Sequence, residues 1–139
     1  MRNALLAAGA GVLAGLSLLT FGYAKGASYL TNDPEACANC HVMKEQLANW
    51  RRSSHRQAAV CNDCHTPVGL VPKYATKAMN GFFHTVAFTT GWFPDHIQIS
   101  ARNRRVAEES CQKCHAGLIA ANHSGGLPRC LHCHESPGH

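Results

Sequence analysis

The sequence predicts a mainly α-helical protein in which one apolar N-terminal helix precedes a small domain of short helices and loops. Three observations support this fold class. Residues 5–23 contain no charged side chain. Strand-like alternation of apolar and polar residues is absent. All eight cysteines occur in one recurring five-residue pattern, which lies wholly within residues 37–134. We therefore expect two parts, an N-terminal segment at 1–25 and a cysteine-bearing domain at 26–139.

The N-terminal run is long enough to cross a membrane. It extends over 19 residues, from Leu5 to Tyr23, with Arg2 before it and Lys25 after it. A helix needs about 20 predominantly apolar residues to span a bilayer. The alternative is a cleaved secretory signal, whose apolar region is usually ~7–15 residues long. Because this run is longer and no A-x-A cleavage pattern ends it, we expect an uncleaved transmembrane anchor.

The recurring pattern is C-x-x-C-H. It occurs four times, at Cys37–Cys40–His41, Cys61–Cys64–His65, Cys111–Cys114–His115 and Cys130–Cys133–His134. Two thiols about one helical turn apart can both form thioethers to one porphyrin, and the histidine that follows can then bind the iron. The pattern therefore predicts four covalently attached c-type haems.

Other uses of paired cysteines fit the pattern less well. Structural zinc also uses C-x-x-C pairs, but zinc does not require a histidine after each pair. Histidine makes up 10 of the 139 residues, so four such histidines would arise by chance with a probability of roughly 3 in 100,000. A thioredoxin-type redox dithiol needs one pair rather than four. No cysteine falls outside the pattern, which disfavours a disulfide framework.

Four haems leave little chain for an ordinary core. After the anchor about 115 residues remain, fewer than about thirty for each haem, so the porphyrins themselves are expected to form the core, close together. Closely packed haems conduct electrons, which predicts an electron-transfer protein. Because c-type haem is attached on the outer face of the cytoplasmic membrane, the domain at 26–139 is expected to be periplasmic.

Helices are expected around these haems in three stretches. These stretches are Pro34–Arg56, Val71–Thr85 and Arg105–His115. Glycine and proline residues predict a loop-rich C-terminal end, namely Gly125, Gly126, Pro128 and Pro137.

The anchor followed by four C-x-x-C-H motifs resembles the NapC/NirT family of membrane-bound tetrahaem quinol dehydrogenases. The first motif continues to Met43, and the segment NGFFHTVAFTTGWFPDHIQISARNRR is most similar to the branch made up of the small, quinol-oxidising subunits of cytochrome c nitrite reductase. The resemblance implies menaquinol oxidation at the cytoplasmic membrane and electron delivery to a periplasmic pentahaem (NrfA-like) nitrite reductase. It also allows a homodimer within a larger complex, and it implies no nitrite-reducing site in this chain.

Axial ligands follow partly from the motifs and partly from the resemblance. His65, His115 and His134 are expected to be the proximal ligands of haems 2, 3 and 4. For haem 1 the motif alone indicates His41. The resemblance instead implies Met43, with the opposite face of that haem open to quinol. A thioether is a weaker donor to ferric iron than imidazole, so it would raise the reduction potential.

The resemblance also implies distal ligands from elsewhere in the chain. His55 is expected to bind haem 3 and His139 haem 2. Haem 4 is left without a distal ligand from this chain, and in complexes of the family a lysine of the partner protein can complete one haem. The few residues between His134 and His139 hardly reach the opposite face of haem 4, which favours a neighbouring haem for His139. His96 and His123 are expected to be surface residues.

The quinol site is expected around Lys77 and His84, in the stretch KAMNGFFH. The family has a lysine at the first of these positions and commonly an aspartate at the eighth, where this chain has His84. A histidine titrates near neutral pH and could accept a quinol proton; it could equally bind the iron of haem 1 or cap another haem. The nearby aromatic side chains could enter the membrane interface or cover haem faces; they are Phe82, Phe83, Phe88, Trp92 and Phe93.

Two functions of different class remain open at this level. The first is a membrane quinol dehydrogenase that feeds a periplasmic reductase. The second is a multihaem carrier that shuttles electrons between redox proteins or feeds another terminal reductase, without its own quinol site. No motif for nucleotide or nucleic-acid binding is present.

Overall fold

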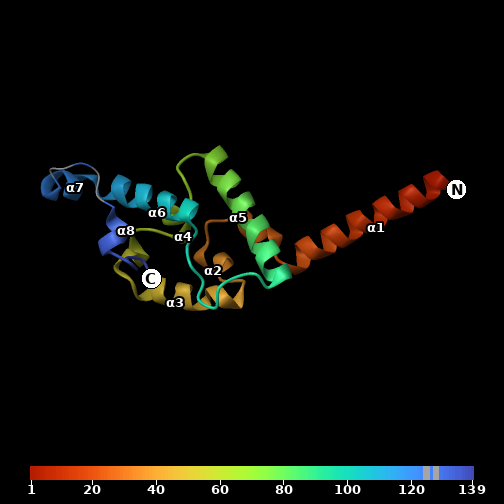
Figure 1. Cartoon of the computed structure of the whole chain (residues 1–139), viewed down its shortest axis with the longest axis horizontal. Coiled ribbons are helices and arrows are strands. Elements are labelled where there is room, and N and C mark those ends of the chain that lie inside the picture. Colours follow the sequence, from red (N-terminus) through yellow and green to blue (C-terminus); the bar gives the residue numbers. More distant parts are fainter. Residues whose placement is uncertain (124–125, 127–128) are drawn as a thin grey trace.

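The chain begins with a long helix that projects away from the rest of the molecule (Figure 1). A computed structural model describes residues 1–123, 126 and 129–139. Helix α1 extends over Arg2–Tyr23, and none of its residues is buried. Its mean hydropathy reaches 2.0, and it is the single helix among the described residues that is long and apolar enough to cross a membrane. Lys25, in the left-handed region at φ 51°, follows the helix and precedes the next element.

The region from Pro34 to Arg56 differs from its prediction. One continuous helix was expected, but the chain forms four short elements: α2 (Pro34–Cys37), the 3-10 helix η2 (His41–Met43), α3 (Lys44–Arg52) and the 3-10 helix η3 (Ser54–Gln57). Extended backbone at Cys40 (ψ 128°) and at Ser53 (ψ 159°) breaks the helical hydrogen bonding. The first break falls inside the first cysteine motif.

The other two helix predictions are confirmed with shifted ends. Helix α5 extends over Leu70–Thr90 and lies between Gly69 (φ 101°) and Gly91 (φ 68°), conformations that favour glycine at both ends. Helix α6 extends over Ala101–Cys114 and is capped by Ser100, whose hydroxyl accepts a hydrogen bond from the amide of Asn103 at 3.3 Å.

Four further elements were not predicted. They are the 3-10 helix η1 (Gly26–Leu30), α4 (Cys61–His65), α7 (Ala116–Asn122) and α8 (Cys130–Cys133). Gly126 and Pro137 lie outside the helices, as expected of a loop-rich end, whereas Gly125 and Pro128 fall outside the described residues. No strand occurs in the part of the chain that the structure describes, which confirms the mainly α fold.

Short helices surround the middle of the domain rather than a large apolar core. Helix α6 packs against α4, α7 and α8, while η1 packs along α5. Leu47 and Ala107 are the only buried apolar side chains among the described residues. A domain of this length ordinarily buries well over half of the surface of its unfolded chain. The fold therefore suits large apolar groups that occupy its interior.

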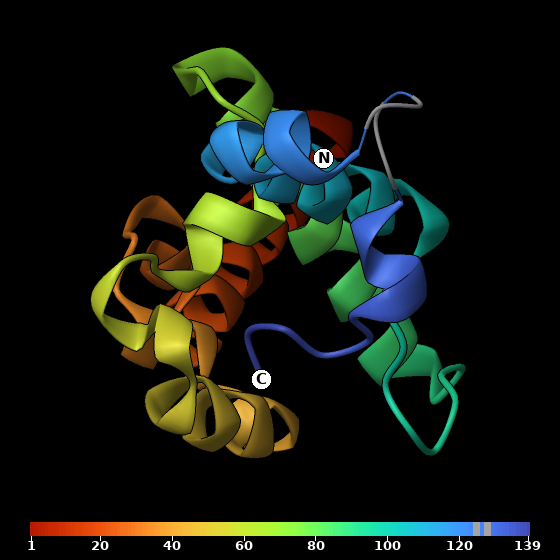
Figure 2. The same ribbon diagram turned by 90° about the vertical axis from the view of Figure 1, so that its left-hand side faces the viewer.

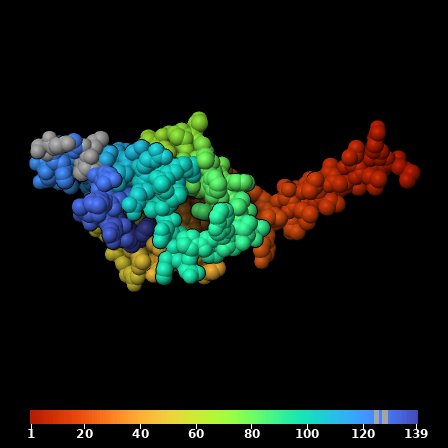
Figure 3. Space-filling view, in the orientation of Figure 1, coloured from red at the N-terminus to blue at the C-terminus, as the bar shows by residue number. Residues whose placement is uncertain are grey.

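The C-terminal segment runs back into the middle of the domain, between α3 and α8 (Figure 2). The surface is hollowed beside the segment that joins α5 to α6 (Figure 3). This arrangement brings the chain end close to motifs that lie far away in the sequence.

Candidate functional site

Each cysteine motif lies on or beside a short helical turn. Three cysteine pairs lie within helices, in α4, at the end of α6 and in α8, whereas in the first motif Cys37 ends α2 and Cys40 follows as extended backbone. All eight thiols are free, and all are at least partly exposed. No group of three or more histidine, cysteine, aspartate or glutamate side chains that could hold a metal ion occurs among the described residues.

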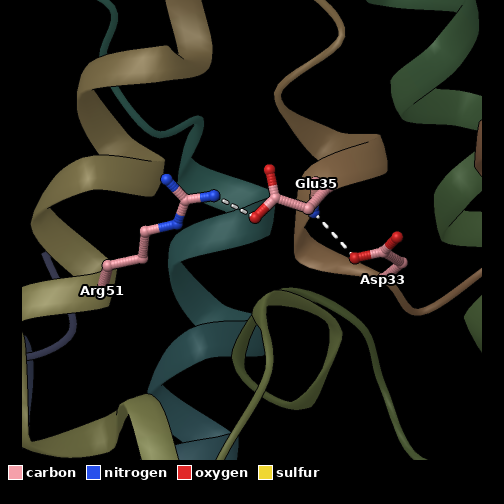
Figure 4. A network of polar contacts seen from close by, with 3 residues as sticks. All are labelled: Asp33, Glu35 and Arg51. Carbon is pink, nitrogen blue, oxygen red and sulfur yellow. Dashed lines mark hydrogen bonds and ion pairs between the residues drawn. The ribbon is translucent and has the colours of Figure 1, made fainter.

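Figure 4 shows how the first motif is braced. Asp33 caps α2 by accepting a hydrogen bond from the amide of Glu35 at 3.0 Å. Arg51, on α3, forms an ion pair with the Glu35 carboxylate, so the helices on either side of the motif are joined. Because both side chains of the pair are about half exposed, the ion pair itself contributes little stability.

The four motifs form a series in space. The Cys61 thiol is hydrogen-bonded to Cys37, which lowers the pKa of Cys37 to about 7. Helix α4 of the second motif packs against α6 of the third, and α6 packs against α8 of the fourth. Burial, and then the nearby charge of Cys130, raise the pKa of the Cys111 thiol. Each motif thus adjoins the next in chain order.

Two pairs of histidine rings face each other across the domain. His55 and His115 have ring centres 6.0 Å apart with their planes at 80°. His65 and His139 have ring centres 6.0 Å apart with their planes at 8°. In each pair one member follows a cysteine motif and the other comes from a distant part of the chain.

This spacing fits an iron ion between two imidazoles. A metal–imidazole nitrogen bond is roughly 2 Å long, and each ring centre lies about 1 Å beyond its nitrogen, so two opposed axial ligands have ring centres about 6 Å apart. The angle between the planes is free, since each ring can rotate about its own bond to the metal. The donor set therefore fits bis-histidine haem at the second and third motifs.

A backbone carbonyl sets the orientation of one of these rings. The Nδ1 atom of His55 lies 2.9 Å from the carbonyl oxygen of Pro137. A carbonyl only accepts, so Nδ1 carries the proton and Nε2 keeps its lone pair for a metal. The segment that brings His139 to His65 thereby also holds His55.

The first and fourth motifs are less symmetric. His41 and Met43 both belong to η2, where His41 is exposed and Met43 half-buried. At the fourth motif the Glu108 carboxylate, on α6, accepts hydrogen bonds from the amides of Cys130 and Leu131. Among the described residues, no histidine ring faces His134 as the two pairs face each other.

Lys77 and His84 lie on one face of α5, two turns apart, and both contact the segment that follows α1. The Lys77 ammonium donates a hydrogen bond to the carbonyl oxygen of Thr31 at 2.6 Å, and the lysine is only 7% exposed. The Nδ1 atom of His84 lies 3.5 Å from the hydroxyl oxygen of Tyr29. Lys77 and His84, the two residues predicted for the quinol site, therefore both lie beside residues 29–31.

The same segment contacts the first cysteine motif. Asn39, between the two cysteines, is hydrogen-bonded to the Ser28 hydroxyl, and Lys25 donates to the Asn39 side chain at 3.4 Å. The anchor exit, the first motif and α5 therefore meet at one place. The sequence prediction missed Tyr29 and Asn39; the only available signals were the position of Tyr29 between the anchor and the first motif and that of Asn39 inside the motif.

Burial changes the pKa values of three side chains where the anchor exit, the first motif and α5 meet. Burial lowers the pKa of His84 and favours its neutral ring. Burial, and then the Lys73 charge, lower the pKa of Lys77, which the charge of Cys37 partly opposes. Burial, and then charges on Cys40 and Cys37, raise the pKa of Tyr29, so its hydroxyl keeps its proton. A neutral imidazole beside a protonated phenol can accept a proton from a third group.

Comparison with known proteins gives one consistent result. The chain is 40% identical to the cytochrome c-type protein NrfH of Wolinella succinogenes, over 90% of this chain and 78% of that protein. It is 27% identical to the cytochrome c nitrite reductase subunit NrfH of Nitratidesulfovibrio vulgaris, over 96% of this chain and 82% of that protein. It is also 27% identical to the cytochrome c-type protein NapC of Escherichia coli, over 78% and 68% of the two chains.

Comparison of the fold with solved structures points to the same group of proteins as comparison of the sequence. A chain in the crystal structure of the cytochrome c nitrite reductase NrfHA complex, bound to the inhibitor HQNO, matches with a TM-score of 0.66 and 26% identity, over 94% of this chain and 88% of that chain. The family model for the N-terminal region of NapC/NirT cytochromes c matches residues 2–139. This protein therefore belongs to the NapC/NirT cytochrome c family.

Proposed function

We propose that this protein is a membrane-anchored tetrahaem cytochrome c that oxidises menaquinol and passes the electrons to a periplasmic pentahaem nitrite reductase of the NrfA type. The observation that carries the quinol half of this proposal is the meeting of the anchor exit, the first cysteine motif and the Lys77–His84 face of α5. A lipid-soluble donor reaches a protein from the bilayer, so its site should adjoin the point where the anchor leaves the membrane.

The proposed partner, a pentahaem nitrite reductase, is inferred from the proteins that this chain resembles. Two of them are named NrfH, one of these as a subunit of cytochrome c nitrite reductase, and the matching fold comes from an NrfHA complex. A 40% identity over most of the chain favours a shared partner over a shared fold alone.

The residues that would hold the haems follow from the site. Eight cysteines supply the thioethers: Cys37, Cys40, Cys61, Cys64, Cys111, Cys114, Cys130 and Cys133. His65 with His139 would bind the second haem, and His115 with His55 the third. Met43, with His41 as the alternative, would serve the first haem, and His134 the fourth. When bound, haem c supplies the one-electron chemistry that the side chains lack.

The chain's own residues manage the protons. Oxidation of a quinol releases protons, and a neutral imidazole such as His84 can accept one within hydrogen-bond reach of a hydroxyl. The Lys77 ammonium is a donor that orients an oxygen of the headgroup and favours the negative charge that deprotonation creates. Its bond to the Thr31 carbonyl fixes it on this face while leaving other N–H groups free.

In this proposal residues 1–25 anchor the protein in the cytoplasmic membrane and residues 26–139 form the haem domain on the periplasmic side. Exposed aromatic side chains near the end of α5 suit the membrane interface; among them Phe82 is 65% exposed and Trp92 88% exposed.

Purification from native membranes tests both halves. We expect a pentahaem nitrite reductase to co-purify, and we expect the complex to oxidise a menaquinol analogue in a reaction that HQNO inhibits. A second measurement separates the alternative function. If the haem-loaded protein is reduced by soluble proteins but leaves menaquinol untouched, it is a carrier without a quinol site and the proposal is wrong. Capture of a different terminal reductase would overturn only the partner.

A further inference from the structure

We propose that Tyr29 is a positioning residue for the proton acceptor His84, holding the imidazole by a hydrogen bond to Nδ1. The inference deepens the proposed function and rests on it. It starts from the contact between the Tyr29 hydroxyl oxygen and His84 Nδ1 at 3.5 Å, which joins η1 to α5 across 55 residues of sequence. Such bonds are often long in the absence of substrate and tighten when it binds.

The Tyr29 ring packs against the backbone of α5. It lies against Gly81, three residues before His84 on α5, where the helix backbone is bare. A Cβ atom on that glycine would lie 3.2 Å from Cε1 and 3.3 Å from Cζ of Tyr29, closer than ordinary contact. A glycine in the interior of a helix costs about 1 kcal/mol relative to alanine. At this position it gives the aromatic ring close access to α5.

Two neighbouring residues hold the segment in register. The Tyr74 hydroxyl donates to the carbonyl oxygen of Leu30 at 3.3 Å, and the Lys77 ammonium donates to that of Thr31 at 2.6 Å. Three consecutive residues of the chain, 29–31, are therefore each tied to α5. Tyr29 cannot slide along the helix without breaking the bonds that hold the two residues after it.

The tautomer of His84 explains why this contact matters. An imidazole can accept a proton at Nε2 only if the hydrogen of its neutral form is on Nδ1. In the tautomer that we propose for His84, Nδ1–H donates to the Tyr29 oxygen, and the same bond persists after Nε2 has taken a proton from the quinol hydroxyl. In the opposite tautomer Nε2 carries the hydrogen and cannot act as a base. Tyr29 thus holds the reactive nitrogen outward.

The titratable groups around this contact come from two elements. Tyr29 faces His84 from η1, and Lys77 lies two turns earlier on the helix of His84. Cys37 and Cys40 of the first motif carry no charge once they form thioethers. Burial raises the pKa of Tyr29 and lowers that of His84, so both are neutral at the pH where the quinol is oxidised.

The test uses the full-length, haem-loaded protein in complex with its reductase. Tyr29→Phe keeps the ring on Gly81 and removes the hydroxyl. We expect kcat for menaquinol-analogue oxidation to fall about tenfold, the acid limb of its pH profile to shift, and the haem spectra to stay unchanged. The matched control is Tyr23→Phe, which removes the hydroxyl of an exposed tyrosine at the end of α1; its rate should stay within about twofold of wild type.

A double variant identifies the partner of Tyr29. With His84→Gln in place, Tyr29→Phe should have no further effect, because both substitutions remove one interaction. Equal rates and pH profiles for Tyr29→Phe and wild type would overturn the inference, as would altered haem spectra in His84→Gln, which would make His84 an iron ligand. A wild-type complex that oxidises no menaquinol would instead refute the proposed function itself.

Gly81→Ala gives a second measurement that leaves both reacting side chains intact. Its methyl group should push the Tyr29 ring away and slow quinol oxidation, although alanine favours the helix. Gly117→Ala, in α7 with nothing within 4 Å of the added atom, controls for helix propensity and should leave the rate unchanged. A Gly81→Ala protein with an unchanged rate would contradict the proposed role of the contact between the Tyr29 ring and Gly81.

Discussion

Two histidine pairs are the candidate haem ligands that the structure brings together at the scale of residues. In each pair a histidine that follows a cysteine motif faces a histidine from a distant segment, so folding is needed to complete the site. The C-terminal segment contributes twice, because His139 faces His65 while the Pro137 carbonyl orients His55. The two central sites are therefore coupled through a few residues of irregular backbone.

Replacement of His139 by alanine tests this pairing. We expect one of the four haems to change from low-spin to high-spin, because the iron next to His65 would lose its second imidazole. Electron paramagnetic resonance of the oxidised protein, with carbon monoxide binding after reduction, measures the change.

The control for this variant is His123→Ala. His123 is exposed and belongs to neither ring pair, so its loss should leave all haem signals as in the wild type. An unchanged spectrum for His139→Ala would mean that His65 is opposed by another ligand.

If His84 is the proton acceptor, as proposed, the pH dependence of quinol oxidation follows from its environment. Burial lowers the pKa of His84 below its ordinary value of 6.5. Only the neutral ring accepts a proton, so activity should be fully present above the lowered pKa and lost as the pH falls through it. The acid limb of the rate profile should have its midpoint below about 6.5 and should be absent from His84→Gln. A midpoint above that value would contradict the assignment of His84 as the acceptor.

At the scale of elements, the sequence predicted what depends on regular helix and missed what depends on the haem motifs. The stretches within α5 and α6 have helical composition and recognisable caps, so their existence could be foreseen. The predicted helix from Pro34 to Arg56 was wrong because extended backbone at Cys40 and at Ser53 interrupts it. Short elements such as α4 and α8 hold only four or five residues, too few for periodicity to show.

Glu108 joins two of these elements. Its carboxylate accepts the amide hydrogens of Cys130 and Leu131, so α6 caps the short helix of the fourth motif. Glu108→Ala would leave both amides without this acceptor, and we expect the free energy of unfolding to fall by about 1–2 kcal/mol. Chemical denaturation of the haem-loaded protein, followed by circular dichroism, measures the loss.

The neighbouring residue provides the control for Glu108. Glu109 is exposed, carries the same charge and occupies the next position of α6, so Glu109→Ala should change the stability by less than about 0.5 kcal/mol. Equal losses for the two variants would assign the effect to helix charge rather than to the cap.

On the scale of the whole molecule, the candidate site could be predicted as residue types but not as contacts. The eight cysteines and the histidines that follow them are visible as a repeated pattern, and Lys77 and His84 are visible through the family resemblance. Tyr29, Asn39 and the Pro137 carbonyl have no such signal, because their roles arise only when the segment after the anchor and the chain end pack against distant elements.

In the proposed function, the anchor is the part of the molecule that brings the quinol donor and the haem domain together. Helix α1 buries none of its residues against the protein, and its apolar side chains lie open along its length, as for Leu13 at 68% and Leu18 at 73% exposure. If α1 stays in the membrane, the native protein should retain its N-terminus and resist an alkaline carbonate wash. An N-terminus near residue 25 in the mature protein would show instead that the segment is a cleaved signal.

Replacing residues 1–25 by a cleavable export signal separates tethering from haem binding. The attachment motifs begin only at Cys37, so the released domain should still take up four haems and be reduced by dithionite. Menaquinol is confined to the bilayer, however, and the proposed site adjoins the anchor exit, so the domain should lose at least about tenfold in the rate of menaquinol oxidation in vesicles. The retained reduction by dithionite ensures that this loss reflects access to the quinol rather than misfolding. A released domain that oxidises vesicle menaquinol as fast as the anchored protein would mean that the anchor plays no part in delivering the donor.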